Sequence, residues 1–237
     1  QERIHCLLSF LPKFILKRYQ LLVFLYPLVI ENFNLSEYDL VISLNNSFSH
    51  GVITNSQTCH VAYYHSPMRF IWDYWKQYPI DLNMGRFQRI IWSLIAKKLR
   101  VWDFIAAQRT DYRIAISNVI KGRIRKYYRS SSKVINPPVN TEQFKPKDAQ
   151  DFYLIVSRLS KYKNIDLAIK GFNKLGKKLI IAGTGKEEDN LRKIADSNVE
   201  LLGYVSEEKR IELFESCKGF IVLANEEDFG ITPIEAM

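Results

Sequence analysis

The sequence predicts an α/β protein made of two parallel-sheet domains, and three observations carry that prediction. Short runs rich in apolar and β-branched residues alternate with amphipathic stretches of helical periodicity along most of the 237 residues. Several of the runs are continuously apolar, which is typical of strands covered on both faces of a parallel sheet. The balance of charges changes sign near residue 149, which indicates two domains with different partners.

In the first half of the chain, three apolar runs predict buried strands at residues 39–43, 60–64 and 112–117. Residues 86–109 contain no Gly or Pro and repeat apolar residues at helical spacing, which predicts one long helix. A shorter basic helix is predicted at residues 118–128. The prolines that follow it at 137 and 138 cannot continue a helix. They lead into a polar stretch, and we place the domain boundary there, between residues 145 and 146.

In the second half, apolar runs and amphipathic stretches alternate regularly. Such alternation indicates βαβ units on a parallel sheet, and sheets of this kind bind ligands at the carboxyl ends of their strands. We predict strands at 152–157, 178–182, 199–205 and 219–224, and helices at 164–175, 186–195 and 207–216.

The first half of the chain is basic and rich in aromatic residues. Residues 1–149 contain 21 Lys and Arg against 10 Asp and Glu, whereas residues 150–237 contain 13 against 15. All four tryptophans lie in the basic half. This composition fits an anionic membrane surface, a nucleic acid or an anionic substrate, and it equally fits an ordinary solvated face. On the helix at 118–128, Lys121, Arg125 and Tyr128 share one arc beside Ile120 and Ile124, which fits either anionic headgroups or solvent.

An acidic segment near the C-terminus, residues 227–235 with the sequence EDFGITPIE, follows an apolar strand and leads into a helix. Gly230 allows a close backbone approach, and the free N–H groups at a helix start suit a diphosphate. The carboxylates of Glu227 and Glu235 would instead accept hydrogen bonds from hydroxyls, so a nucleotide sugar fits the segment. The alternative is structural: residues 232–235 also form a good capping box, with Thr232 at the N-cap and Glu235 at N3.

Three further positions are candidates for binding or catalysis. Arg158 and Lys163 are cations in the loop that follows the strand at 152–157, where they can meet phosphate or simply be solvated. Gly183, in a Gly-Thr-Gly sequence after the next strand, either admits a ligand closely or forms a tight turn. His65 ends an apolar strand, where it either serves acid/base chemistry or is structural. No spacing of His or Cys suggests a metal site.

Four segments together resemble a known family, the retaining GT-B glycosyltransferases of family 4. They are HSPMRFIWD at residues 65–73, NPPVNTEQF at 136–144, SRLSKYK at 157–163, and the Glu-x7-Glu pair formed by Glu227 and Glu235. The resemblance covers nearly the whole chain and is greatest to bacterial mannosyltransferase-like members that build surface polysaccharides. It implies a GT-B fold, in which two Rossmann-like domains, on the acceptor and the donor side, face a cleft. It also implies transfer of a sugar, with mannose as one candidate, with retention of configuration.

The resemblance implies a role for each matching position. Arg158 and Lys163 would neutralise the donor diphosphate, and Glu235 would hold the ribose. The catalytic pair would be Glu227, at the donor sugar hydroxyls, and His65, facing the reacting centre from the N-terminal domain. The acidic loop would line the sugar and phosphate site, and the segment after the strand at 199–205 would lie against the base. These further binding positions are Gly203, Val205, Asp228, Phe229, Gly230, Ile231 and Thr232.

The family also sets expectations about partners. No cofactor or metal is expected, since a GDP- or UDP-linked sugar is the substrate, and the acceptor would be a glycan or a lipid-linked molecule. We expect no nucleic-acid partner, and a cytoplasmic location that includes contact with the inner membrane face if the basic half binds headgroups. The family's N-terminal Gly-rich loop and C-terminal part have no match, so both domains are expected to be incomplete. Two alternatives stay open: an α/β oxidoreductase, which lacks the full G-x-G-x-x-G, and a basic nucleic-acid-binding module, which lacks a recognised motif.

Overall fold

The computed structural model describes residues 23–145, 147–224 and 227–237. The chain divides into two compact units, unit 1 at Gln1–Asn136 and unit 2 at Pro137–Met237. The division falls within the Asn-Pro-Pro sequence that cannot be helical. Each unit has its own parallel sheet of four strands, as in the predicted α/β class.

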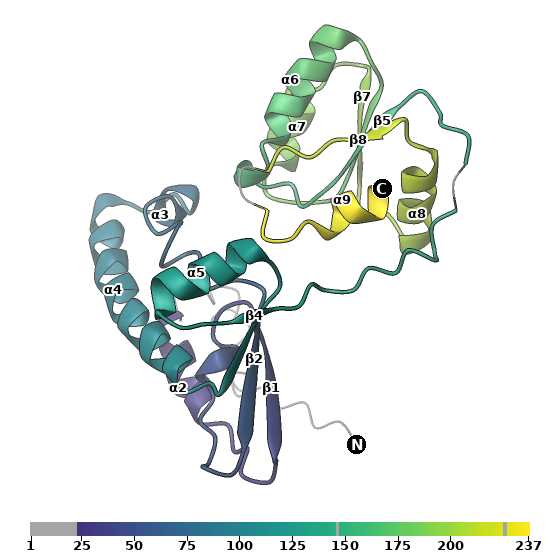
Figure 1. Ribbon diagram of the computed structural model, residues 1–237. Coiled ribbons are helices and arrows are strands. Elements are labelled where there is room, and N and C mark those ends of the chain that lie inside the picture. Colours follow the sequence, from purple (N-terminus) through teal and green to yellow (C-terminus); the bar gives the residue numbers. More distant parts are fainter. Residues whose placement is uncertain (1–22, 146, 225–226) are drawn as a thin grey trace. The chain divides into compact units, whose positions relative to one another are not determined.

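Unit 1 is built on a sheet with the strand order β1-β2-β3-β4 (Figure 1). The three long strands and two long helices predicted from the sequence are present, whereas β4, α2, η2 and α3 were not predicted. The strands are β1 (Leu40–Asn45), β2 (Cys59–Tyr64), β3 (Tyr112–Ala115) and β4 (Lys133–Val134). The helices are α2 (Tyr26–Glu31), the 3₁₀ turn η2 (Ser49–Gly51), α3 (Tyr78–Asp81), α4 (Arg86–Gln108) and α5 (Asn118–Tyr128).

The helix α4 begins at the residue that its sequence predicts. At its start, the Gln88 side chain accepts a hydrogen bond from the backbone N–H of Gly85 at 2.8 Å. Its inner face joins Trp92, Ala96 and Leu99 to Met68 and Ile71 in one apolar cluster. Burial of this stripe stabilises the helix more than its intrinsic propensity does.

The helix α5 corrects the expectation of an apolar and basic surface on residues 118–128. Ile120, Ile124 and Tyr128 are fully buried, because this stripe is the face that packs on the rest of unit 1. The basic side chains Lys121 and Arg125 are exposed, but Ile120, Ile124 and Tyr128 do not belong to the same exposed surface.

Unit 2 is a sheet with helices on both faces and the strand order β7-β6-β5-β8. One apolar cluster joins α6 and α7 to one face, and a second joins α8 and Ala236 of α9 to the other. The strands are β5 (Tyr153–Val156), β6 (Leu179–Ala182), β7 (Val199–Gly203) and β8 (Gly219–Phe220). The helices are the 3₁₀ turn η3 (Lys161–Lys163), α6 (Ile165–Leu175), α7 (Glu188–Ile194), α8 (Glu207–Ser216) and α9 (Ile231–Ala236).

The strand order of unit 2 contains a topological switch point. β5 pairs with β6 on one side and with β8 on the other, because the chain runs outward from β5 to β6 and β7 and then returns to the opposite side of β5 to form β8. In open parallel sheets, the crevice at the carboxyl ends of the two strands flanking such a point is where ligands bind. The fold of unit 2 therefore points to the ends of β5 and β8.

Candidate functional site

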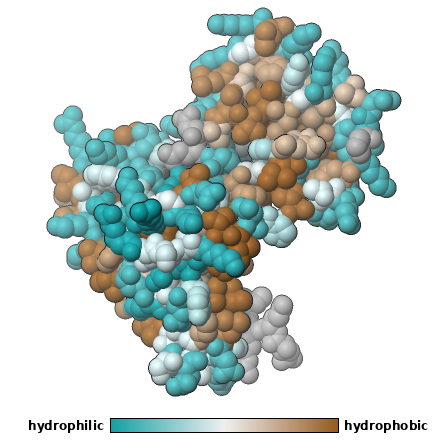
Figure 2. All heavy atoms as spheres, in the orientation of Figure 1, coloured by the Kyte–Doolittle hydropathy of each residue, from teal (hydrophilic) through white to brown (hydrophobic). Residues whose placement is uncertain are grey.

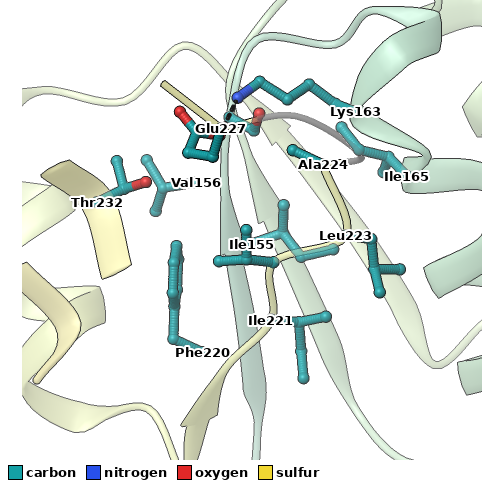
Figure 3. Close-up of a pocket in the computed structure, with 12 residues that line it drawn as sticks. Ile155, Val156, Lys163, Ile165, Phe220, Ile221, Leu223, Ala224, Glu227 and Thr232 are labelled. Atoms are coloured by element: carbon teal, nitrogen blue, oxygen red, sulfur yellow. Dashed lines mark hydrogen bonds and ion pairs between the residues drawn. The ribbon is translucent and has the colours of Figure 1, made fainter. Parts of the chain in front are cut away.

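A small hollow lies at the carboxyl ends of β5 and β8, at the switch point (Figure 3). Its walls come from the end of β5, from the apolar segment that follows β8, and from polar residues that include Ser157, Lys163, Glu227 and Thr232. The free volume is about 20 Å³, which is room for about one water molecule.

An ion pair closes one side of this hollow. The Lys163 Nζ lies 2.8 Å from Oε2 of Glu227, and both side chains are partly exposed. Lys163 ends the turn η3, and the next residue, Asn164, adopts a left-handed conformation and donates a hydrogen bond to the Leu223 carbonyl at 3.0 Å. This contact fixes the turn to the segment after β8. The structure thus brings together a cation and a carboxylate that the sequence places 64 residues apart.

Arg158 and Thr232 complete the polar groups of this region. Arg158 is exposed in the loop after β5 and forms no ion pair within the part of the chain that the structure describes. Thr232 lines the hollow from α9. Gly230 precedes α9 with φ 82° and is buried, so the loop bends there in a conformation that favours glycine. Asp228 and Phe229 are half-buried, Ile231 is exposed, and Glu226 lies outside the described residues.

The predicted capping box at residues 232–235 is wrong. The helix α9 starts at Ile231, with Gly230 rather than Thr232 at the N-cap and no side-chain cap. Glu235 instead accepts a hydrogen bond from Nη1 of Arg210 on α8 at 2.5 Å, and its side chain is only 10% exposed. Arg210 also pairs with Glu207, and this hydrogen bond, followed by the one to Glu235, raises the pKa of the guanidinium. Arg210 is the residue that sequence reasoning missed, because no local pattern links positions 25 apart.

Gly183 has a structural reason to be glycine. Its φ is 137°, and a Cβ there would lie 1.9 Å from the Ser157 carbonyl oxygen. The loops after β5 and β6 run backbone against backbone, with the Leu159 N–H donating to the Thr184 carbonyl at 2.9 Å. The glycine sequence is therefore a close packing of two loops, and a ligand contact at Gly183 stays a prediction.

Gly203, Val205 and His65, which the sequence also predicts to bind or react with the substrate, do not line the hollow. Gly203 ends β7 with φ 70°, Tyr204 is 84% exposed, and Val205 packs against the core under α8. His65 belongs to unit 1, where it follows β2, is exposed and stacks edge-on against Tyr63 with ring centres 5.6 Å apart. Its role at a reacting centre stays a prediction.

A buried polar network in unit 1 was also not predicted. His50 contacts Asn45 Oδ1 through Nδ1 at 3.0 Å and Asp103 Oδ1 through Nε2 at 3.2 Å, and the second oxygen of Asp103 accepts from the Trp72 indole at 2.7 Å. This network ties the segment after β1 to α4. Within residues 23–145, 147–224 and 227–237, no group of three or more His, Cys, Asp and Glu side chains could hold a metal ion.

The C-terminal part of the chain matches a known family. Residues 138–237, nearly all of unit 2, match the sequence model described as Glycosyl transferases group 1. The matched part of the chain contains the hollow, the Lys163–Glu227 pair and Glu235. A search of curated proteins finds no significant match.

Solved structures with the same fold are glycosyltransferases. The Anabaena protein Alr3699/HepE, crystallised with UDP and glucose, aligns over 99% of this chain and 62% of its own, with a TM-score of 0.59 and 15% identity. A variant of S. aureus TarM, crystallised with Fondaparinux, alpha-GlcNAc-glycerol and UDP, aligns over 77% and 36%, with a TM-score of 0.55 and 18% identity. The lipopolysaccharide outer core galactosyltransferase WaaB aligns over 95% and 60%, with a TM-score of 0.52 and 17% identity.

These likenesses confirm the predicted α/β fold of the GT-B glycosyltransferases, with two parallel four-stranded sheets. The chain spans less than two thirds of the length of each of these three structures.

Proposed function

We propose that the protein transfers a sugar from a nucleoside diphosphate to a hydroxyl acceptor, and that unit 2 binds this donor at the hollow beside β5 and β8. The observation that carries the proposal is the Lys163–Glu227 pair at the topological switch point. A cation and a carboxylate at one site match a ligand that combines phosphate with sugar hydroxyls. The Glycosyl transferases group 1 match over the same residues supports this assignment.

Donor binding replaces the ion pair. The ion pair closes one side of the hollow, so the proposed donor reaches this site when Lys163 and Glu227 separate. Both side chains are partly exposed, and such a pair contributes at most about 1 kcal/mol. Lys163 then meets the diphosphate together with Arg158, while Glu227 accepts hydrogen bonds from the sugar hydroxyls. Each charge keeps a partner, so opening the site costs little.

Glu235 is proposed to hold the ribose, with Arg210 as its positioning residue. Arg210 occupies Oε2 of Glu235, which leaves Oε1 to accept a hydrogen bond from a ribose hydroxyl. Gly203 and Val205 would lie against the base, and the loop from Asp228 to Thr232 would line the sugar and phosphate.

UDP is the first candidate for the nucleotide, because Alr3699/HepE and TarM were both crystallised with UDP. GDP, with mannose as the sugar, is the alternative. The proposed reaction keeps the configuration at the sugar by substitution on one face: the diphosphate leaves, cations stabilise its charge, and the acceptor hydroxyl enters beside it. The acceptor would be a glycan or a lipid-linked hydroxyl, and His65 would face the reacting carbon.

Calorimetry on the full chain tests the donor site. Arg158→Ala and Lys163→Met should each weaken UDP binding by about 1.5–3 kcal/mol, the scale of a hydrogen bond to a charged group. Lys161→Met is the matched control, since Lys161 is an exposed cation two residues away on the same turn and should leave UDP affinity unchanged.

Glu227→Gln separates the two halves of the donor. It should weaken binding of UDP-glucose relative to UDP, because only the sugar nucleotide has hydroxyls for Glu227 to hold. If UDP and GDP both fail to bind, or if Lys161→Met loses as much affinity as Lys163→Met, the donor site is not at this hollow. NAD and a short oligonucleotide serve as competitors for the two alternative functions.

A further inference from the structure

The helix α4 is apolar on two opposite faces. Its inner face is buried in the core of unit 1, through residues such as Trp92, Ala96 and Leu99. A helix at the surface of a soluble protein normally has polar residues opposite such a stripe. Here the outer face instead exposes Phe87 (74%), Ile90 (62%), Ile91 (42%), Leu94 (61%), Val101 (57%), Phe104 (37%) and Ile105 (53%).

Every exposed charged residue of α4 is basic. Arg86, Arg89, Lys97 and Lys98 are all exposed on α4. The only acidic residue of the helix, Asp103, is fully buried and bound to Trp72 and His50. The exposed side of α4 therefore combines a broad apolar surface with four cations and no carboxylate.

An apolar groove continues this surface. It has a volume of about 490 Å³ and is lined by Phe24, Pro27, Ile95, Lys98, Leu99 and Trp102, so Lys98 is the one charged residue in its lining among the residues that the structure describes. Figure 2 shows hydrophobic residues, in brown, mixed with hydrophilic ones along the edge where Figure 1 places α4. Patches of this kind mark sites of interaction with a protein or a membrane.

We propose that the outer face of α4 lies in the interface of a bilayer that contains anionic lipids. Apolar side chains with basic ones beside them are the pattern of helices that lie in the plane of a membrane, with the apolar face among the acyl chains and the cations at the phosphates. A second copy of the chain fits this face poorly. A symmetric contact would bring Lys97 and Lys98 toward the partner's cations, and α4 offers no exposed carboxylate to compensate. No helix among the described residues has the length and apolarity needed to cross a bilayer.

This assignment is independent of the proposed donor site and differs from the surface expected on α5. Both helices expose basic residues, but α5 exposes only Val119 as a large apolar side chain. Positive charge alone would favour α5 as the membrane-binding surface. The combination of positive charge and exposed apolar area favours α4.

Vesicle co-sedimentation of the full chain tests the proposal. Binding should rise when phosphatidylglycerol is added to phosphatidylcholine vesicles, and should fall when 0.5 M salt screens the cations. The triple variant I90S/L94S/V101S should abolish binding, and K97E/K98E should weaken it at least tenfold. The positions are exposed, so the variants should fold, which unchanged circular dichroism verifies.

Two matched controls make the outcome specific. K121E/R125E makes the same charge change on α5 of the same unit, and L167S/L175S removes exposed apolar side chains from α6 of unit 2. Both should bind vesicles like the wild type. The proposal is overturned if the wild type does not bind, if K121E/R125E weakens binding as much as K97E/K98E, or if the triple variant only dissociates a dimer of this chain, as sedimentation velocity would show.

Discussion

Glu235 takes its orientation from another helix and not from the turn that carries it. Its carboxylate and that of Glu207 share Arg210, but the two sites differ in exposure, since the Glu235 side chain is 10% exposed and the Glu207 side chain 58%. A charged hydrogen bond away from water is worth more than the same contact in solvent. Because both glutamates bind Arg210, a change at the exposed Glu207 is a matched control for the same change at Glu235.

Glu235→Gln should lower the free energy of unfolding of unit 2 by about 1 kcal/mol, because the amide still accepts from Arg210 but without charge. It should also weaken UDP binding if Oε1 holds the ribose. Glu207→Gln should change the stability by only a few tenths of a kcal/mol and leave UDP affinity intact. Chemical denaturation and calorimetry measure the two effects, and equal effects of the two variants would refute this assignment.

The stability of unit 1 should depend on pH through His60. Burial of this side chain, with smaller effects of His50, Arg109 and Arg113 against the opposing Asp111, lowers its pKa from 6.5 to about 4. The unfolded chain therefore binds a proton between pH 6.5 and 4 that the folded chain does not, so stability falls as the pH drops through this window. At pH 4.5 the loss should be about 2 kcal/mol relative to pH 7.

Denaturant unfolding at pH 7 and 4.5 measures this loss. His60→Gln is the comparison, since an amide near Ser43, which lies 2.9 Å from the His60 ring, does not titrate. The pH dependence should be smaller in the variant by the same 2 kcal/mol. A variant with the full wild-type dependence would assign the effect to other groups.

Among the elements of unit 2, the paired loops after β5 and β6 leave no room for a side chain. Gly183→Ala would place a Cβ 1.9 Å from the Ser157 carbonyl oxygen, a backbone atom that cannot turn away. The two loops must then separate, and the substitution should lower the free energy of unfolding by about 3 kcal/mol or more. Gly171→Ala is the opposite case, because its Cβ on α6 meets no atom within 4 Å and should stabilise by about 0.5–1 kcal/mol. Thermal unfolding compares them, and a Gly183→Ala protein as stable as the wild type would contradict the tight packing.

The elements show what the sequence could and could not predict. The observed bounds of α4, α6 and α8 lie within one residue of the prediction. The run at residues 219–224 looks like one strand, yet only Gly219 and Phe220 pair with β5, and the residues after them line the hollow. Apolar character alone does not distinguish a strand that pairs in the sheet from a segment that lines a pocket.

Site residues were predictable from the sequence only where their position next to a predicted strand places them at the ligand-binding edge of the sheet. Lys163 and Glu227 follow the ends of strands, and the rule for parallel sheets places such residues near one edge. The Arg210–Glu235 contact depends on how α8 and α9 pack beside each other on one face of the sheet, which no local pattern records. For the same reason the capping box at Thr232 failed: tertiary packing determines where α9 begins.

At the scale of the whole molecule, the two proposals fall on different units. The donor hollow and its charged pair belong to unit 2, whereas the apolar and basic face of α4 belongs to unit 1. The excess of Lys and Arg in residues 1–149 and its absence from residues 150–237 follow the same division.

A nucleotide should therefore stabilise unit 2 without stabilising unit 1. A ligand at 100 times its dissociation constant adds about 2.7 kcal/mol to the state that binds it. Hydrogen exchange with and without UDP should show slower exchange in β5, β6 and α6 and no change in β2, β3 and α4. Equal protection of both units would mean that they unfold as one, or that the nucleotide contacts both.

The placement of the tryptophans gives the protein a built-in optical label. Trp72, Trp75, Trp92 and Trp102 all lie in unit 1, and unit 2 has none. Selective excitation of tryptophan at long ultraviolet wavelengths therefore produces fluorescence from unit 1 and none from unit 2. An emission-monitored melt follows the loss of the core around Trp92, and far-ultraviolet ellipticity follows both halves together. The difference between the two curves is the unfolding of unit 2, obtained without attaching a dye or dividing the chain.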